Sequence, residues 1–220
     1  WLLENGCHGL ALFGTTSEAT SFDLEERMAL LEKALSANID PEQLMVGTGC
    51  CAVTDTVKLT RHALDHGCTK VLMLPPFYYK GVSDTGLYDA YAYVIDQVND
   101  PSLRIFMYHF PKMSATPLSV DLVGKLVDGF GDVIAGLKDS SGDWSNTAEL
   151  IGRFSQMAIF PGTETLLLDG LNQGGAGVIS ATANANPAAI RAVFNAWAEK
   201  SDSAQERQEF INGSRGIFNQ

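Results

Sequence analysis

The chain has 220 residues, of which 45% are hydrophobic and 19% are charged, a composition typical of a globular protein with a buried core. Its formal net charge is -11 and it contains no basic cluster, which argues against nucleic acid or an anionic membrane surface as a partner. No apolar stretch approaches the roughly 20 residues that cross a bilayer, and the N-terminal residues lack the basic segment of a signal peptide.

Four cysteines occupy positions 7, 50, 51 and 68. No two of them form a C-x-x-C pair, and no histidine lies at ligand spacing from any of them, so the cysteines do not predict a zinc site. We therefore expect reduced thiols in a cytoplasmic protein, with neither a metal nor a cofactor.

Short apolar runs alternate with longer amphipathic segments along the chain. Runs of this length that are apolar on both faces are typical of strands in a parallel sheet. They cover residues 9–14, 44–49, 71–75, 105–108, 133–138, 157–160 and 177–181.

Helical patterns lie between these runs. Leu24 to Leu35 and Thr56 to Leu64 repeat apolar residues at helical spacing beside charged neighbours. Ser119 is placed to cap a later helix, and Asn186 followed by Pro187 has the pattern of an N-cap with proline at the first helical position.

The unbroken alternation of strand and helix predicts an α/β protein with a parallel sheet, either doubly wound or closed into a barrel. Residues 1–6, W-L-L-E-N-G, have the pattern of a helix end closed by Gly6, and a helix before the first visible strand implies one more strand. One strand added to the visible runs completes a (β/α)8 TIM barrel. We therefore predict a single barrel domain over residues 1–220, lacking its first strand and truncated at both ends.

Lys138 ends the apolar run V-I-A-G-L-K, where a charged group is unexpected. A buried charge is costly unless it is paired or neutralised. Either Lys138 reaches solvent, or it pairs with Asp139, or the fold keeps a neutral amine there. Taken without context, the salt bridge with Asp139 is favoured over catalysis.

Polar residues follow several of the predicted strands, where the active sites of such barrels lie. A neutral lysine there can attack a carbonyl to form a Schiff base, and Tyr108 at the end of the preceding run is a reasonable proton carrier. The turn G-T-T-S-E of residues 14–18 offers hydroxyls and backbone N–H groups that can hold a carboxylate. Each residue taken singly is more often core, interface or turn, and their shared position at strand ends favours a site.

Five motifs of the chain occur in the order and spacing of one enzyme family. They are G-T-T-S-E, F-Y-Y-K, Y-H-F-P, G-L-K-D-S-S-G-D and G-G-A-G-V-I-S-A-T-A-N. In them the chain resembles the dihydrodipicolinate synthase and N-acetylneuraminate lyase family over nearly its whole length. The resemblance implies a class I aldolase on an eight-fold barrel, a homotetramer built as a dimer of dimers, with pyruvate and an aldehyde as small-molecule substrates.

The resemblance also implies catalytic roles. Lys138 would form the Schiff base with the keto carbon of pyruvate, and Tyr108 would be the general acid and base beside it. Thr15 and Tyr79 would complete a proton relay, with Tyr79 reaching in from a neighbouring subunit.

Substrate-binding roles follow in the same way. Thr16 and Gly14 belong to the turn that would hold the pyruvate carboxylate. Ile179 would pack near the bound pyruvate, and Gly162 would border the pocket of the second substrate.

Two departures from the family pattern bear on function. Ser17 stands where the family turn usually has a second glycine, and serine tolerates positive φ poorly, so we expect an altered turn. Met113 stands where the synthase keeps an arginine that grips the carboxylate of its aldehyde, and methionine cannot bind a carboxylate in this way. Lys112 would lie on the opposite side of the chain if the segment is extended.

These departures favour a lyase acting on a sugar-derived 2-keto acid, such as an N-acetylneuraminate lyase or a 2-keto-3-deoxy sugar acid aldolase. The alternatives are 4-hydroxy-tetrahydrodipicolinate synthase, a keto-deoxy sugar acid dehydratase, and a barrel that binds a keto acid without turnover. A phosphate site at Gly174 to Gly177 is a fourth alternative, but those glycines precede the last predicted strand and favour a turn.

Overall fold

The computed structural model describes residues 1–218, which divide into two compact units. The larger unit is Gly9–Leu137, and the smaller unit combines Trp1–His8 with the chain from Lys138 onward. No helix in the described part of the chain has the length and apolar character needed to cross a membrane. The prediction of one domain over the whole chain stays a prediction.

The larger unit alternates strands with helices, as the sequence predicts. Its strands are β1 (Leu10–Leu12), β2 (Leu44–Gly47), β3 (Lys70–Met73), β4 (Arg104–His109) and most of β5 (Ile134–Asp139). Its helices are α1 (Leu24–Ser36), α2 (Val53–Asp65), α3 (Asp84–Val98), α4 (Pro111–Ser114) and α5 (Val120–Phe130).

The strands of the larger unit lie side by side in chain order, β1 to β5. The pairs β1–β2, β2–β3 and β3–β4 are parallel, and in the last pair Met73 lies opposite Met107. A doubly wound sheet reverses its strand order at a switch point, whereas a barrel keeps sequential order. The sequential order confirms the parallel α/β prediction and favours the barrel over the doubly wound sheet.

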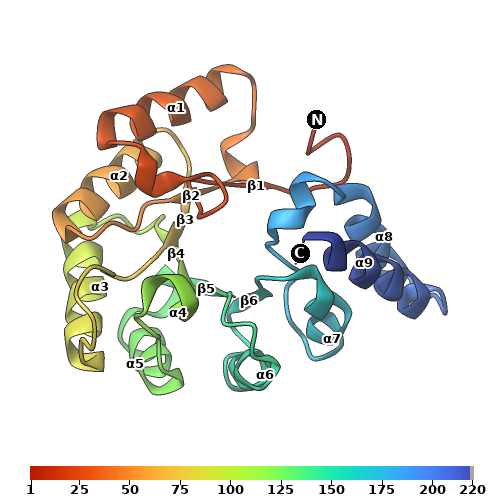
Figure 1. Ribbon diagram of the computed structural model, residues 1–220. Coiled ribbons are helices and arrows are strands. Elements are labelled where there is room, and N and C mark those ends of the chain that lie inside the picture. The colour runs from red at the N-terminus through yellow and green to blue at the C-terminus, as the bar shows by residue number, and fades with distance from the viewer. Residues whose placement is uncertain (219–220) are drawn as a thin grey trace. The chain divides into compact units, whose positions relative to one another are not determined.

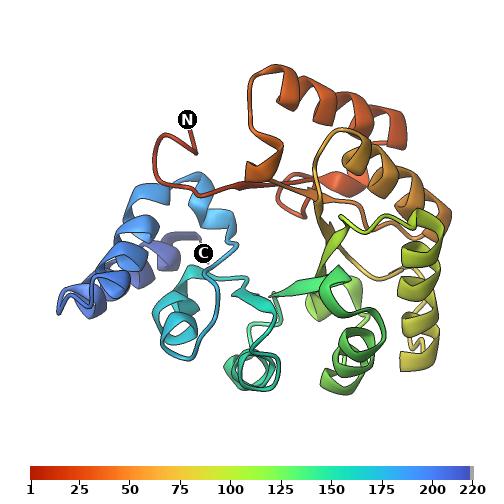
Figure 2. The ribbon, with the colours of Figure 1, turned by 180° about the vertical axis from the view of Figure 1, so that it is seen from behind.

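Helices α1, α2, α3 and α5 cover one face of these strands in a consecutive row (Figures 1 and 2). The strands are buried on both faces, since neighbouring residues Val71, Leu72 and Met73 are all at most 2% exposed. Side chains alternate along a strand, so consecutive buried residues require cover on each side.

Helix ends in this unit follow sequence signals. Asp23 and Glu26 form a reciprocal capping box at the start of α1, and Ser119 accepts a hydrogen bond from the backbone N–H of Leu122 at the start of α5. The Ser119 cap is thereby confirmed. Helix α2 begins three residues before the predicted Thr56, without a side-chain cap.

The smaller unit contains the carboxyl end of β5, one further strand and most of the C-terminal helices. Its elements are α6 (Trp144–Arg153), β6 (Ala158–Pro161), α7 (Leu167–Asn172), α8 (Pro187–Ala198) and α9 (Ala204–Phe218). Asn186 precedes Pro187 at the first position of α8 as predicted, but its side chain makes no capping hydrogen bond.

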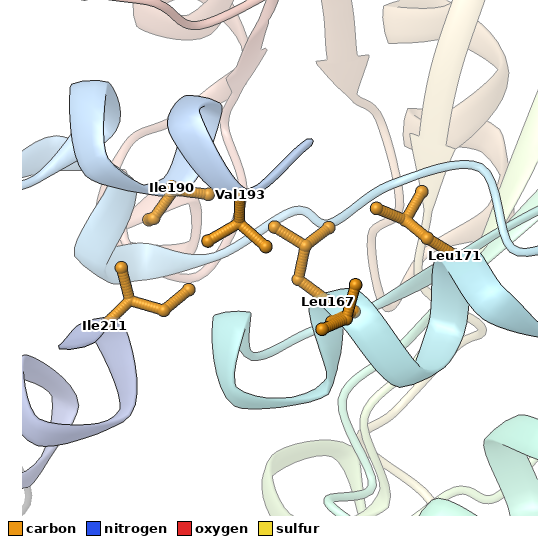
Figure 3. Packing of buried hydrophobic residues seen from close by; sticks show 6 residues of the cluster. Leu167, Leu171, Ile190, Val193 and Ile211 are labelled. Carbon is orange, nitrogen blue, oxygen red and sulfur yellow. The ribbon is translucent and has the colours of Figure 1, made fainter. Parts of the chain in front are cut away.

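Helices α7, α8 and α9 enclose a compact apolar cluster (Figure 3). Leu167, Val193 and Ile211 are each at most 1% exposed and approach one another from the three helices. Burying a Leu, Val or Ile side chain contributes about 1.5–3 kcal/mol, so this cluster stabilises the unit.

The predicted strand at residues 177–181 is wrong as a regular strand. The segment runs alongside β6 and is hydrogen-bonded to it. The Ala176 N–H donates to the Ile159 carbonyl (2.9 Å), and the Ile179 N–H donates to the Pro161 carbonyl (3.2 Å). Gly177, with φ of 143°, interrupts the ladder, because that conformation lies outside the β region of ordinary residues. Residues 181–184 then turn into a 3-10 helix.

The opening residues form a single turn. The Asn5 N–H donates to the Trp1 carbonyl (2.9 Å), and Gly6 has φ of 114°, as expected of a glycine that ends a turn. The glycines after α7 also form a turn, since Gly174 and Gly175 donate to the carbonyls of Leu171 and Gly170. The predicted first strand and the closure of the barrel stay predictions.

The fully buried Tyr91 of α3 ties the helix layer to the carboxyl end of β3, because its hydroxyl donates to the Met73 carbonyl (3.0 Å). Burial raises the pKa of Tyr91 far above its usual range, so the group remains a donor. We predict that Tyr91→Phe lowers the free energy of unfolding by about 1–2 kcal/mol, because a buried carbonyl loses its partner. Urea denaturation measures this change, and Tyr93→Phe, on the exposed face of α3, is the control. An unchanged midpoint in Tyr91→Phe would contradict the assignment.

Candidate active site

Tyr108 supplies a buried hydroxyl near the carboxyl end of β4. It is 3% exposed, and its ring stacks on Phe110 with centroids 5.7 Å apart. Its Oη lies 3.2 Å from Oγ1 of Thr15, and either hydroxyl can be the donor. The structure therefore brings together two of the predicted proton-relay residues, although they are 93 positions apart in the chain.

Thr15 is held by the tight turn that follows β1. Ser17 and Ala19 donate backbone hydrogen bonds to the Gly14 carbonyl, and Glu18 donates to the Thr15 carbonyl. This turn leaves Thr16 exposed, where its hydroxyl can meet a ligand.

The expected alteration of this turn assumed a positive φ at Ser17, and that assumption is wrong. The left-handed residues are Phe13, with φ of 56°, and Glu18, with φ of 53°. The turn therefore bends before and after the family's glycine position, and a serine fits at position 17 without positive φ.

Arg27 of α1 supports this turn and was missed by the sequence analysis. It is 5% exposed, and it donates to the Gly47 carbonyl at the end of β2 (2.6 Å) and to Sγ of Cys50 (3.2 Å). Its guanidinium lies 5.7 Å from the ring centroid of Phe13, the residue before the turn. Burial raises the pKa of the Cys50 thiol, which favours the neutral thiol beside Arg27. The available signal was a charged residue four positions before Leu31, on the buried face of the helix.

Tyr79 lies in the loop after β3 and is 77% exposed. Its ring packs edge-on against Tyr78, with centroids 5.2 Å apart. The structure therefore gives Tyr79 no buried place beside Thr15, and its predicted role in the relay stays a prediction.

In the smaller unit, the carboxyl of Asp139 is buried and hydrogen-bonded at the end of β5. It is 2% exposed and accepts hydrogen bonds from Thr147 Oγ1 (2.6 Å), Asn146 Nδ2 (3.0 Å) and the Ser141 N–H (2.9 Å). Two of these donors belong to the first turn of α6. Asp139 therefore points toward α6 and binds its first turn.

This arrangement fixes the direction of Lys138. Successive side chains of a strand point to opposite faces, so Lys138 points away from the face on which Asp139 binds α6. The lysine is partly exposed. The strand thus ends in an amine on one face and a carboxyl on the other.

Gly162 and Ile179 lie next to this strand end within the smaller unit. The Gly162 N–H donates to the Asp139 carbonyl (2.6 Å), and Ile179 is half-buried. A side chain at position 162 would meet Ser140 Oγ at 2.2 Å, so the close approach of the two strand ends itself requires glycine.

A buried carboxyl follows Gly162 and was also missed. Glu164 is 2% exposed, accepts a hydrogen bond from the Ser180 hydroxyl and lies 3.5 Å from the guanidinium of Arg215. Gln208 of α9 donates to its backbone carbonyl (3.0 Å). These bonds link the segment that carries Ile179 to α9, and the signal was a glutamate directly after the G-T of a strand end.

Comparison with known proteins places these features in a family. The sequence profile described as the Dihydrodipicolinate synthetase family matches residues 1–213. The chain belongs to this family. An "Uncharacterized DapA-like lyase" of Chloroflexus aurantiacus is 37% identical over 219 residues, which are 100% of this chain and 72% of that protein.

Solved structures agree with this assignment. Dihydrodipicolinate synthase from Agrobacterium tumefaciens is 37% identical, with a TM-score of 0.83 over 87% of this chain and 67% of that chain. YagE from E. coli K12, a member of the dihydrodipicolinic acid synthase family solved in complex with pyruvate, is 25% identical, with a TM-score of 0.89 over 99% of this chain and 73% of that chain. The protein is a class I aldolase or lyase of the dihydrodipicolinate synthetase family, on an α/β fold consistent with a TIM barrel.

Asp143 holds the first turn of α6 and with it the donors to Asp139. Its carboxylate accepts hydrogen bonds from the Ser145 hydroxyl (2.6 Å) and the Ser145 N–H (2.9 Å), and these bonds lower the pKa of Asp143. A lowered pKa in the folded state means that this stabilisation is present above the usual carboxyl pKa and is lost as pH falls through the folded pKa.

We predict that the stability advantage of the native protein over Asp143→Asn is constant from about pH 8 to pH 5 and shrinks below about pH 4. Asparagine still caps the helix but does not titrate, so the difference in Tm between the two proteins isolates the carboxylate. A difference in Tm that stays the same between about pH 6 and about pH 3 would contradict this account of Asp143.

Proposed function

We propose that the protein is a pyruvate-dependent class I aldolase that makes or cleaves a carbon–carbon bond in a sugar-derived 2-keto acid. The observation that carries the proposal is the end of β5, where Asp139 is engaged by α6 and Lys138 is directed to the opposite face. Family membership supports it, because the relative YagE was solved in complex with pyruvate.

In the proposed reaction the neutral amine of Lys138 attacks the keto carbon of pyruvate, and water leaves as the Schiff base forms. Loss of a proton from the methyl carbon gives an enamine, which attacks the aldehyde carbon and forms the new bond. Hydrolysis then releases the product and restores the amine. Cleavage runs through the same steps in reverse.

Tyr108 is the proposed proton carrier in these steps. Its hydroxyl already shares a hydrogen bond with Thr15, so a proton moved to or from Tyr108 can pass to a second hydroxyl. Thr16 and Gly14 would hold the pyruvate carboxylate with the donors of their turn, and Ile179 and Gly162 would border the substrates. The action of Tyr108 on the Schiff base of Lys138 is part of this proposal, and family membership supports it.

A homotetramer is part of the proposal. Tyr78 and Tyr79 are 71% and 77% exposed, which is unusual for two adjacent large aromatic side chains and supports a role for this loop at a subunit interface. Tyr79 would then serve the site of a neighbouring subunit.

Trapping of the Schiff base tests the nucleophile. We predict that pyruvate and borohydride add a reduced three-carbon adduct to Lys138, because borohydride reduces the imine to a stable amine. Intact mass and peptide mapping locate the adduct. Lys138→Arg should abolish it, and Lys80→Arg should leave it unchanged, since the Lys80 amine donates to the Ser114 carbonyl (2.9 Å). An adduct on Lys80 or Lys112 would overturn the assignment.

The same assay separates binding of pyruvate from proton transfer. Tyr108→Phe should still form the adduct while turnover falls by about 10²–10⁴, the usual effect of losing a positioned acid or base. Near-normal turnover would reduce Tyr108 to a packing residue.

The synthase is the second candidate, because a dihydrodipicolinate synthase is among the relatives at 37% identity. Met113 bears on this choice. Its side chain is 64% exposed. Met113 and Lys112 both belong to the short helix α4, so the expectation for Lys112, which assumed an extended chain, does not apply. A methionine offers no charge to the carboxylate of aspartate semialdehyde.

We predict that kcat/KM for glyceraldehyde or longer sugar aldehydes exceeds that for aspartate semialdehyde by at least about tenfold, or ~1.4 kcal/mol. Met113→Arg should narrow this gap, because arginine can bind the carboxylate in a bidentate manner. Lys112→Met is the matched control for charge on α4 and should leave the preference unchanged. Efficient use of aspartate semialdehyde by the native protein would favour the synthase over the sugar-acid aldolase as the function of this protein.

A further inference from the structure

A cluster of three potential metal ligands lies on the helix layer of the larger unit, on residues that the proposed function does not use. Glu32 belongs to α1, His62 belongs to α2, and His66 is the residue at the C-terminal end of α2. One ligand atom from each lies within 4.8 Å of the other two. The helices α1 and α2 pack side by side, which brings the glutamate to the histidines (Figure 1).

The two histidines have the spacing of a helical chelate. Residues four apart lie on one face of a helix, and two histidines so spaced are a known zinc-binding arrangement. Although His66 lies at the helix end, its ring still faces His62, with centroids 4.3 Å apart. The two imidazole rings therefore lie next to each other, as two ligands of one ion must.

The backbone fixes the orientation of the His66 ring. Its Nδ1 lies 2.8 Å from the His62 carbonyl, and only a protonated Nδ1 can donate to a carbonyl. Nε2 then carries the lone pair. A hydrogen bond from the second ring nitrogen to a carbonyl is the arrangement that orients metal-binding histidines in general.

His62 and Glu32 supply the other two potential ligand atoms of the cluster. His62 Nε2 lies 3.5 Å from Glu32 Oε1, close to the roughly 3.3–3.5 Å that separates two ligands bound to one zinc ion at about 2.0–2.1 Å. The same Nε2 lies 3.3 Å from the Met28 carbonyl, a long contact that it would give up to bind an ion. The His62 side chain is 15% exposed and that of Glu32 is 55% exposed, so the cluster opens to solvent.

We propose that Glu32, His62 and His66 form a zinc site that joins α1 to α2. Two imidazoles and a carboxylate suit zinc and its neighbours in the first transition series, whereas magnesium and calcium prefer all-oxygen sites. Three protein ligands leave the fourth position of a tetrahedral ion to water. The site stabilises the helix pair and takes no part in the proposed carbon–carbon chemistry.

Titration calorimetry on tag-free, metal-stripped protein tests the site, with Zn²⁺ as the probe and Mg²⁺ as the negative control. We expect about one Zn²⁺ per chain and no heat with Mg²⁺. His66→Gln and Glu32→Gln should each weaken binding by at least about tenfold, since even the loss of a residue that supports a ligand costs 10–100-fold. His8→Gln and Glu25→Gln, both exposed and outside the cluster, are the matched controls and should bind as the native protein does.

Thermal unfolding gives a second readout that does not depend on activity. Zinc at about 100 times its Kd should raise Tm by about 5 °C or more in the native protein, and this increase should largely disappear in His66→Gln. Circular dichroism of the metal-free variants checks that they fold.

Two results would overturn the proposal. One is zinc binding that is equal in the native protein, His66→Gln and Glu32→Gln. The other is zinc binding that disappears in a Cys50→Ser, Cys51→Ser variant, because the ion would then sit on the thiols. Since the aldolase assay and the trapping of pyruvate on Lys138 do not use this cluster, its failure leaves the proposed function standing, and the reverse also holds.

Discussion

The hydrogen bonds from α6 to the carboxyl of Asp139 are the constraint on which the proposed chemistry depends. Three donors hold a buried carboxyl at the end of β5, and two of them come from one helical turn. Because side chains alternate along a strand, fixing Asp139 against the helix also fixes Lys138 on the opposite face. A lysine at the end of a core strand is therefore tolerable: its neighbour carries the buried polar interaction, and the amine is directed elsewhere.

The hydroxyl pair of Thr15 and Tyr108 depends on a comparable arrangement in the larger unit. Tyr108 is placed by a buried strand, whereas Thr15 is on a turn that has no regular structure of its own. The turn is held by its own backbone hydrogen bonds and by Arg27, which binds the end of β2 and lies beside Phe13. A buried arginine with carbonyl and ring partners is a costly but rigid support, since desolvation of the charge is offset only in one geometry.

Much of this could be predicted from the sequence, because the patterns involved are local. The run that ends in Lys138 became β5, and the repeat from Leu24 to Leu35 became α1. The prediction of a strand at residues 177–181 failed because a strand needs a regular ladder, and Gly177 interrupts the ladder between the hydrogen bonds to β6. Composition alone does not report such an interruption.

The candidate site was harder to predict than the fold. Lys138 and Tyr108 were found as polar residues at strand ends, and the Lys138–Asp139 sequence suggested a salt bridge, but sequence order could not show that Asp139 binds Thr147 and Asn146. Positive φ in the first turn was expected at Ser17 and is found at Phe13 and Glu18, because several local conformations can produce the same bend. The metal prediction considered histidine spacing only relative to cysteine, and so it did not weigh the four-residue spacing of His62 and His66.

The contrast between buried support and exposed variation accounts for how one framework can serve several lyases. Ser114 of α4 is 3% exposed and is held by Lys80 and Phe110, whereas Met113 beside it is 64% exposed. Substitution of an exposed residue changes stability by little, usually within about 0.5 kcal/mol, while a substitution among the buried partners costs more. Met113, which we propose bears on the choice of aldehyde, is therefore free to change without loss of the fold, and the buried residues beside it are not. The chain is 37% identical to both a DapA-like lyase and a synthase, so the overall match reports the shared framework and does not by itself separate these two kinds of protein.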